Sequence, residues 1–203
     1  MKAILIKDFV KNPEEVFNRL YNELEWKRYS SKPRKEYYCN DNDVPYSYGK
    51  AEYADTYFRS PYTTDILVIR EALEKELGVV LDVCFLNLYE DASEHIGWHA
   101  DDSPEMDPDR PIVTVSLGAV REIFFKERPD SRLDKPVVAV NKSGKKPDFL
   151  LLENGSACIM PAGMQNTHLH KIPKNDKPCG PRISLTFRGY KRASSWGSFI
   201  YWG

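Results

Sequence analysis

The sequence predicts an α+β fold that is mainly β, with helices near its start followed by an antiparallel sandwich or barrel. Two helical patterns precede residue 80, whereas residues 80–190 hold a run of strand-like segments without helices between them. Strands in such a run pair antiparallel and pack as a sandwich or close into a barrel. With 203 residues and 41% hydrophobic content, we expect one domain spanning 1–203.

A short strand and two helices are expected before residue 80. AILI is typical of a strand. NPEEVFNRLYNELEW has apolar residues at helical spacing after Asn12, a candidate N-cap, and Pro13, which suits the first helical position. TDILVIREALEKELG shows the same spacing and ends at Gly78, a favourable helix stop. We expect each helix to pack by one face.

Residues 27–62 lack a steady hydrophobic period. They contain eight tyrosines and the turn-rich stretch NDNDVPYSYG, together with the basic residues Lys32, Arg34 and Lys35. We interpret this segment as turns and short strands that form a surface lid.

The strand-like segments after residue 80 are separated by clusters of Gly, Pro, Asp and Asn. They are VVLDVCFLNLYE, RPIVTVSLG, VREIFFKE, KPVVAVN, DFLLLENGSACIMP and PRISLTFRGY. The stretch NKSGKKP, with Lys142, Lys145 and Lys146, is expected to be an exposed basic hairpin tip.

Composition gives no general attraction to nucleic acid or anionic membranes. Lys plus Arg total 29 against 30 Asp plus Glu, so any such partner depends on local patches. The start of the chain lacks a signal-peptide pattern, and no apolar stretch approaches a bilayer span. We therefore expect an intracellular protein, cytoplasmic or nuclear, with reduced cysteines.

Alternation places polar side chains of two strands on one face each, because residues two apart on a strand point the same way. Either strand alone fits an ordinary half-exposed strand. If these faces line the interior of a small barrel, their arginines suit a small carboxylate. The residues are Arg182, Ser184, Thr186 and Arg188 in RISLTFR, opposite Ile183, Leu185 and Phe187, and Asn87 and Tyr89 in FLNLY, opposite Leu86 and Leu88.

IGWHADDSPEM contains a candidate metal motif, although a solvated acidic loop is the simpler interpretation of this stretch. At the end of a strand, His99 and Asp101 would project to one side. A histidine from a distant strand would complete a two-His, one-carboxylate triad with three open positions, which suits Fe(II). That histidine lies in NTHLHKIP, where His168 and His170 could share a face and spacing does not separate them.

Taken in order, NLYED, IGWHADD, TVSLGAVREIFF, THLHKIP and PRISLTFR resemble the AlkB family of Fe(II)- and 2-oxoglutarate-dependent dioxygenases, especially its nucleic-acid dealkylating members. The resemblance implies a double-stranded β-helix (jelly-roll) core over 80–190 and a nucleotide-recognition lid over 27–62. It implies removal of N-alkyl groups such as 1-methyladenine and 3-methylcytosine from DNA or RNA. Fe(II), 2-oxoglutarate and O2 would be needed, and formaldehyde, succinate and CO2 released.

Carried over by position, the resemblance assigns iron ligands and co-substrate contacts. His170 is preferred to His168 because it precedes Pro173 at a family-like distance from Arg182; His168 becomes a neighbour or substrate contact. Ser184 stands where the family motif has Asn. The implied ligands, which are also the catalytic residues, are His99, Asp101 and His170. The implied co-substrate contacts are Asn87, Tyr89 and Arg182 for the distal carboxylate, with Thr186 and Arg188 near the carboxylate that chelates iron.

Substrate contacts are expected in the lid. Tyr46 and Tyr48 are candidates for stacking on a flipped base, and Arg34, Lys35 and Lys32 for phosphate contacts. Equally, such tyrosines can simply pack and such lysines simply face solvent.

One residue near the motif departs from the family pattern. Relatives often have an acidic residue four positions after the first histidine, where this chain has Ser103; Asp102 or Glu105 would substitute. Trp98 is expected to pack beside the motif, and the aromatic tail SSWGSFIYWG covers a core edge or contacts a partner.

Two alternatives remain beside a monomeric nucleic-acid dealkylase. The same iron chemistry could act on a protein side chain or a small molecule. A non-catalytic jelly-roll binding module is the other alternative, in which the H-x-D motif is fortuitous.

Overall fold

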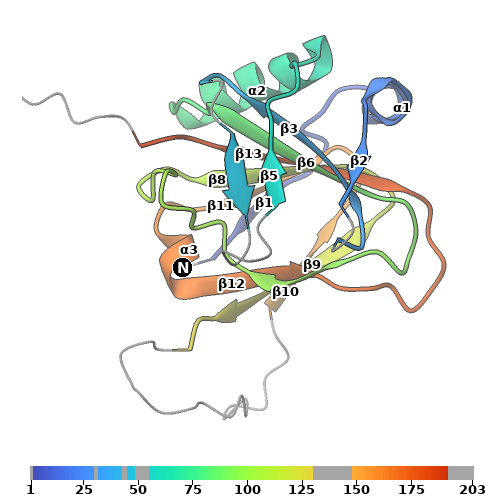
Figure 1. Ribbon diagram of the computed structural model, residues 1–203. Helices are drawn as coiled ribbons and strands as arrows, with labels where there is room; N and C mark the ends of the chain where they lie inside the picture. Colours follow the sequence, from blue (N-terminus) through green and yellow to red (C-terminus); the bar gives the residue numbers. More distant parts are fainter. Residues whose placement is uncertain (1, 30–31, 43–44, 49–54, 130–147, 192–203) are drawn as a thin grey trace, which may run out of the picture.

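Two facing antiparallel sheets form the body of the molecule in the computed structural model, which describes residues 2–29, 32–42, 45–48, 55–129 and 148–191 (Figure 1). The larger sheet has the order β1 (Ile4–Ile6), β11 (Ser156–Met160), β8 (Ile112–Gly118), β13 (Arg182–Arg188), β6 (Val83–Tyr89), β3 (Lys35–Asn40), β2 (Lys27–Arg28). The smaller has the order β10 (Asp148–Leu152), β9 (Arg121–Glu127), β12 (His168–Ile172), β7 (Ile96–His99).

The sheets enclose an apolar interior between them, as expected for a jelly roll. Strands of both sheets contribute to it. The larger sheet supplies Tyr89 and Cys158, and the smaller sheet supplies Ile123, Phe125 and Leu152. A separate hairpin, β4 (Tyr46–Tyr48) with β5 (Asp55–Tyr57), packs against one end of the larger sheet through tyrosines. The predicted mainly β class is therefore confirmed.

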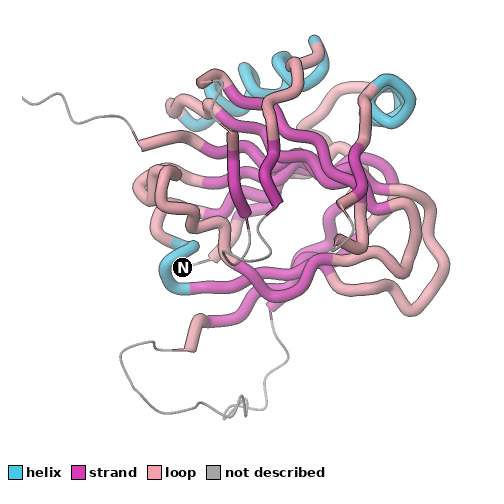
Figure 2. The backbone as a smooth tube through the Cα atoms, in the orientation of Figure 1, coloured by secondary structure: helices cyan, strands magenta, loops and turns pink. Residues whose placement is uncertain are grey.

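Helices α1 (Pro13–Glu23) and α2 (Thr64–Leu77) cover the other face of the larger sheet (Figure 2). Pro13 opens α1 as predicted, but Asn12 stands at the N-cap in a left-handed conformation with φ 48° and makes no side-chain capping bond. Thr63 caps α2 by accepting a hydrogen bond from the Ile66 backbone, and Gly78 ends it with φ 66°. None of the helices in the described part of the chain has the length and apolar composition needed to cross a membrane.

Three details differ from the sequence expectations. Strand β3 falls inside the expected lid but is a buried strand of the larger sheet, because its KEYYCN run packs side chains on both faces. DFLLLENGSACIMP bends at residues 153–155, and its halves, β10 and β11, join different sheets. A short helix, α3 (Met164–Thr167), precedes β12. The expected strand KPVVAVN and hairpin tip NKSGKKP lie outside the described residues.

The position at the end of β8 occupied by Gly118 has no room for a side chain. Its φ is +83°, and a Cβ there would lie 2.5 Å from the Pro181 carbonyl oxygen and 2.7 Å from Phe17 of α1. We expect Gly118→Ala to lower the free energy of unfolding by about 2 to 4 kcal/mol, because backbone strain and overpacking combine. Urea denaturation would measure it, with Gly180→Ala as the control, since a Cβ at Gly180 would have no atom within 4 Å beyond its chain neighbours. Equal stability of the two variants would contradict the expectation.

Candidate metal and co-substrate site

The polar faces of β13 and β6 turn into a cavity between the two sheets. The alternation predicted for both strands is confirmed: the apolar residues of each strand pack in the core under the helices. The residues that line the cavity from these strands are Arg182, Ser184, Thr186 and Arg188 of β13 and Phe85, Asn87 and Tyr89 of β6.

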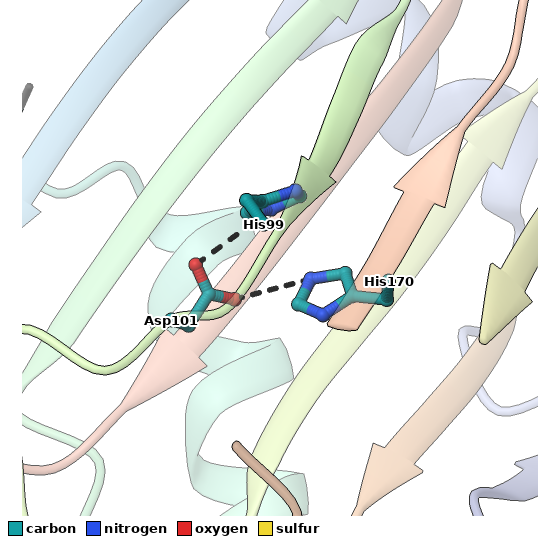
Figure 3. Close-up of side chains that lie close together, drawn as sticks. All are labelled: His99, Asp101 and His170. Carbon is teal, nitrogen blue, oxygen red and sulfur yellow. Dashed lines mark ion pairs between the residues drawn. The ribbon is translucent and has the colours of Figure 1, made fainter. Parts of the chain in front are cut away.

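Two histidines and one carboxylate among the residues that line this cavity lie close together (Figure 3). His99 ends β7, Asp101 follows two residues later, and His170 lies opposite His99 in the register of β12 with β7. One Asp101 oxygen is 3.9 Å from His99 Nε2 and the other is 3.5 Å from His170 Nε2. The three potential ligand atoms all lie within 4.8 Å of one another, close enough to share one ion.

Neighbouring groups keep Asp101 and His99 in the protonation states in which they can bind a metal ion. Burial favours the neutral form of Asp101, but the Arg188 guanidinium, whose Nη2 donates to it at 2.6 Å, and His170 outweigh burial, so the pKa of Asp101 lies well below its usual range. Burial and then His170 lower the pKa of His99 to about 4, so its imidazole is neutral at pH 7.

Hydrogen bonds to neighbouring residues fix the orientation of His99 and the backbone position of Asp101. His99 Nδ1 lies 2.9 Å from the Gly97 carbonyl oxygen, which can only accept, so Nδ1 carries the proton and the Nε2 lone pair faces the cavity. The Asp101 backbone N–H donates to the Gln165 side chain of α3 at 3.0 Å. This hydrogen bond connects the loop after β7 to α3, the helix that precedes β12.

Geometry separates the two candidate histidines of NTHLHKIP. His170 is buried and belongs to the three-residue group, whereas His168 Nδ1 lies 2.8 Å from the Thr167 hydroxyl and His168 pairs with Glu127 of β9. Among the described residues that line the cavity, His99 and His170 are the histidines. His168 therefore lies outside the group of three residues that could share an ion.

The cavity wall also holds a buried cation, Arg182, whose terminal nitrogens have no hydrogen-bond partner among the described residues. Arg182 is fully buried; its Nε donates to Ser116 Oγ at 2.8 Å, and its guanidinium carbon lies 5.3 Å from the centre of the Tyr89 ring. Its Nη1 and Nη2 are buried and have no hydrogen-bond partner within the described part of the chain. Burial lowers the pKa of Arg182 to about 10, which still leaves it charged at neutral pH. Such a fork fits a carboxylate.

The other residues assigned to the co-substrate also line the cavity. Thr186 Oγ1 is 3.4 Å from Thr114 Oγ1, and Arg188 Nη1 donates to the Tyr46 hydroxyl at 3.4 Å. Asn87 Oδ1 accepts from Arg34 Nε at 2.7 Å. Two histidines and a carboxylate are the donor set that suits Fe(II), and a carboxylate would satisfy Arg182, so the residues present fit both groups.

The candidate substrate residues take different positions. Tyr46 is buried in the cavity wall with its hydroxyl 2.5 Å from Ser103 Oγ. Asp102 is exposed and accepts from Arg128 at 2.7 Å. Lys35 pairs with Glu90 at 2.8 Å. The backbone of Tyr48 lies opposite that of Asp55 in the β4–β5 hairpin, and its side chain is outside the described part of the structure.

Arg34 does not occupy the surface position expected of a phosphate contact. Its side chain is buried in the cavity wall, 2.6 Å from Glu36, because that carboxylate neutralises it there. Lys32 lies 3.5 Å from Asp55. Lys142, Lys145, Lys146 and the aromatic tail lie outside the described residues. Trp98 packs under two lysines, Lys126 and Lys171, whose nitrogens lie 4.5 and 4.8 Å from its ring centre.

A family model described as the 2OG-Fe(II) oxygenase superfamily matches residues 5–188. The chain belongs to this superfamily. Human DNA oxidative demethylase ALKBH2 is 31% identical over 86% of the chain and 67% of its own length. The alpha-ketoglutarate-dependent dioxygenase alkB homolog 3 of Bos taurus is 25% identical over 88% of the chain and 62% of its own length. These relatives place the chain in the AlkB family.

A solved structure supports the fold of this AlkB-family oxygenase. The structure of OsALKBH1 superposes with a TM-score of 0.62 and 18% identity, and the match covers 93% of this chain and 96% of the other. At that identity the likeness concerns the jelly roll alone. The predicted family and fold are both confirmed.

Four residues at the site were not predicted from the sequence. Ser116 holds Arg182, Gln165 holds the Asp101 backbone, and Glu36 pairs with Arg34. Arg121 of β9 also lies over the Tyr89 ring, 5.5 Å from its centre. Alternation in TVSLG places Ser116 on the face of Thr114 and could have located it; the others depend on contacts between distant segments.

Proposed function

We propose that the protein is an Fe(II)- and 2-oxoglutarate-dependent dioxygenase that removes N-alkyl groups from DNA or RNA. The observation that carries this proposal is the His99, Asp101 and His170 group beside the partnerless donors of Arg182 in one cavity. The relatives named as DNA oxidative demethylases supply the substrate class.

Each group in the cavity has a role in this proposal. His99, Asp101 and His170 hold the iron, while Arg182, with Tyr89 and Asn87, holds the distal carboxylate of 2-oxoglutarate. Thr186 and Arg188 lie at the chelating end, and Arg188 also keeps Asp101 ionised and aimed at the metal. Bound Fe(II) with 2-oxoglutarate and O2 supplies the oxidising power that hydroxylates an N-alkyl carbon.

The protein supplies position and a dry environment. Arg182 can grip one end of the co-substrate from a fully buried position, which fixes the distance between that end and the metal ligands. The tyrosines of the β4–β5 hairpin pack over the rim against Phe85, and so exclude water from that side. A hydroxylated methyl group on nitrogen then breaks down to formaldehyde and the restored base.

Substrate contacts are proposed at the same rim. Tyr46 and Tyr48 contact the alkylated base, and Lys35 contributes charge for a phosphate. Ser103 lies where the family resemblance often implies an acidic residue. Its hydroxyl lies 2.5 Å from that of Tyr46, so this position donates or accepts hydrogen bonds without adding negative charge. We propose that it relaxes the preference for a positively charged base.

An aerobic incubation tests the function directly. Protein, Fe(II), 2-oxoglutarate and a single-stranded oligonucleotide carrying 1-methyladenine or 3-methylcytosine are combined, and oligonucleotide mass and succinate are followed together. Loss of the methyl mass that depends on 2-oxoglutarate is the expected result. Succinate without demethylation would reassign the substrate to a protein or small molecule. Neither product from folded, iron-loaded protein would overturn the enzyme assignment in favour of a binding module.

The third ligand gives a sharp comparison between neighbouring histidines. We expect His170→Ala to abolish succinate formation, because it removes one of three ligands, and His168→Ala to retain metal binding, because that ring lies against Thr167. Fe(II) titration under nitrogen, followed by succinate release, measures both. Loss of metal affinity in His168→Ala with retention in His170→Ala would reverse the assignment.

A further inference from the structure

We infer that Glu36 and Arg34 are positioning residues that orient Asn87 toward 2-oxoglutarate and connect the co-substrate site to the β4–β5 hairpin through Tyr57. This inference rests on the co-substrate role of Asn87 proposed above. It assigns a function to a buried ion pair that the binding of iron does not require.

The strand register brings these groups together. β3 lies beside β6, and Glu36 of β3 is directly opposite Asn87 of β6. Arg34 immediately precedes β3 and turns inward, with its Nε 2.7 Å from Asn87 Oδ1 and its Nη2 2.6 Å from Glu36 Oε1. All three side chains line the cavity.

Arg34 decides which way the Asn87 amide points. A guanidinium has donors and no acceptor, so the amide atom that faces Arg34 must be the oxygen. The NH2 group of Asn87 is then presented to the rest of the cavity, where it can donate to an anionic oxygen. Without Arg34 at that distance, either end of the amide could face the co-substrate, and an amide oxygen there would repel a carboxylate.

Glu36 in turn fixes Arg34. Arg34 is 5% exposed and Glu36 is 1% exposed, so each charge depends on the other for compensation inside the protein. Arg34 Nη1 also lies 3.5 Å from the His95 carbonyl oxygen, a weaker contact at the limit of a hydrogen bond. The carboxylate is therefore the group that holds the guanidinium against Asn87.

Tyr57 extends the chain of contacts into the hairpin. Its hydroxyl donates to Glu36 Oε2 at 2.7 Å, and burial and then the Glu36 carboxylate raise the pKa of Tyr57 well above its usual range, so the donor keeps its proton. Tyr46 of the same hairpin accepts from Arg188, which holds Asp101. The hairpin thus contacts the co-substrate end through Tyr57 and the metal end through Tyr46.

This arrangement predicts coupling between hairpin and co-substrate. If the position of the hairpin biases the orientation of Asn87, then binding of 2-oxoglutarate must stabilise the hairpin by the same free energy. A substrate that stabilises the hairpin in this position would raise the affinity for 2-oxoglutarate before any reaction occurs.

Binding of 2-oxoglutarate to Mn(II)-loaded protein, measured by calorimetry, tests the inference without turnover. We expect Tyr57→Phe and Glu36→Gln each to raise the dissociation constant of 2-oxoglutarate by about five-fold, the effect of one hydrogen bond of about 1 kcal/mol. Tyr37→Phe is the matched control: Tyr37 follows Glu36 on β3, but its hydroxyl donates to the Pro61 carbonyl oxygen at 2.7 Å. Unchanged affinity in the first two variants would overturn the inference.

A double-mutant cycle separates positioning from general damage. In an Asn87→Ala background, Glu36→Gln should change the dissociation constant no further, because the oriented amide is gone; full additivity would overturn the inference. If Glu36→Gln fails to fold, Tyr57→Phe carries the same cycle. If Asn87→Ala and Arg182→Met bind 2-oxoglutarate as tightly as the wild type, the co-substrate assignment itself fails. Weak binding in those two with normal binding in Tyr57→Phe and Glu36→Gln removes only the positioning role.

Discussion

Asp101→Asn should fold but lose Fe(II) affinity by more than about 100-fold, since removing even a partner behind a metal ligand costs about 10- to 100-fold. The substitution keeps the side-chain shape and removes the anionic ligand between His99 and His170, while Arg188 remains 2.6 Å from that position as an opposing positive charge. Anaerobic calorimetry with Fe(II) measures the affinity, and succinate release measures the consequence.

Asp65→Asn is the matched control for this change. Asp65 also accepts from an arginine, Arg19, through two hydrogen bonds of 2.8 Å, but on the helices outside the sheets. It should bind iron as the wild type does. Wild-type affinity and turnover in Asp101→Asn would remove the metal assignment and leave the H-x-D motif without a chemical role.

Arg182→Met should weaken 2-oxoglutarate binding by about 100-fold while metal affinity stays unchanged. The lost interaction is a charge-assisted fork from a fully buried guanidinium, in which each such hydrogen bond contributes about 1.5 to 3 kcal/mol. Because Nη1 and Nη2 of Arg182 have no hydrogen-bond partner in the described structure, the variant should melt at a temperature equal to or above that of the wild type when 2-oxoglutarate is absent.

Arg70→Met is the appropriate comparison, because Arg70 pairs with Asp41 and Glu74 away from the cavity. Calorimetric titration of both Mn(II)-loaded variants with 2-oxoglutarate gives the affinities. Normal affinity in Arg182→Met would mean that the distal carboxylate binds elsewhere, and it would require a different partner for the buried guanidinium.

The faces of the site could be predicted wherever a strand has one polar and one apolar side. The alternation in RISLTFR and FLNLY placed Arg182 and Thr186 on one face of their strand, and Asn87 on the face opposite Leu86 and Leu88 of its own. Whether those faces lined an interior stayed open until the structure showed both at one cavity. β3 could not be found in this way. Its residues Glu36 to Cys39 are buried on both faces, one against the helices and one against the hairpin, and the alternation that marks a half-exposed strand is absent.

The choice of the third ligand and the position of Arg34 depend on contacts between segments that are distant in the sequence, and so they could not be predicted from local patterns. His168 and His170 are equivalent by spacing, and only the pairing of β12 with β7 brings His170 opposite His99. Arg34 looks like a surface cation in the sequence because nothing in its own segment shows that Asn87, 53 positions later, will accept its hydrogen bond. The resemblance to the AlkB family supplied the proposed roles of these residues, and the structure supplied their neighbours.

Strand β7, which ends in His99, lies at the edge of the smaller sheet, and its register with β12 shifts between His170 and Ile172. An edge strand with an irregular register is held by fewer backbone hydrogen bonds and frays more easily than a central strand. An ion that binds His99 and Asp101 on one side and His170 on the other would cross-link β7 to β12 beside the point where their register shifts. Bound iron would then stabilise the smaller sheet as well as take part in the reaction. Loss of the iron would make β7, one wall of the proposed co-substrate cavity, more mobile.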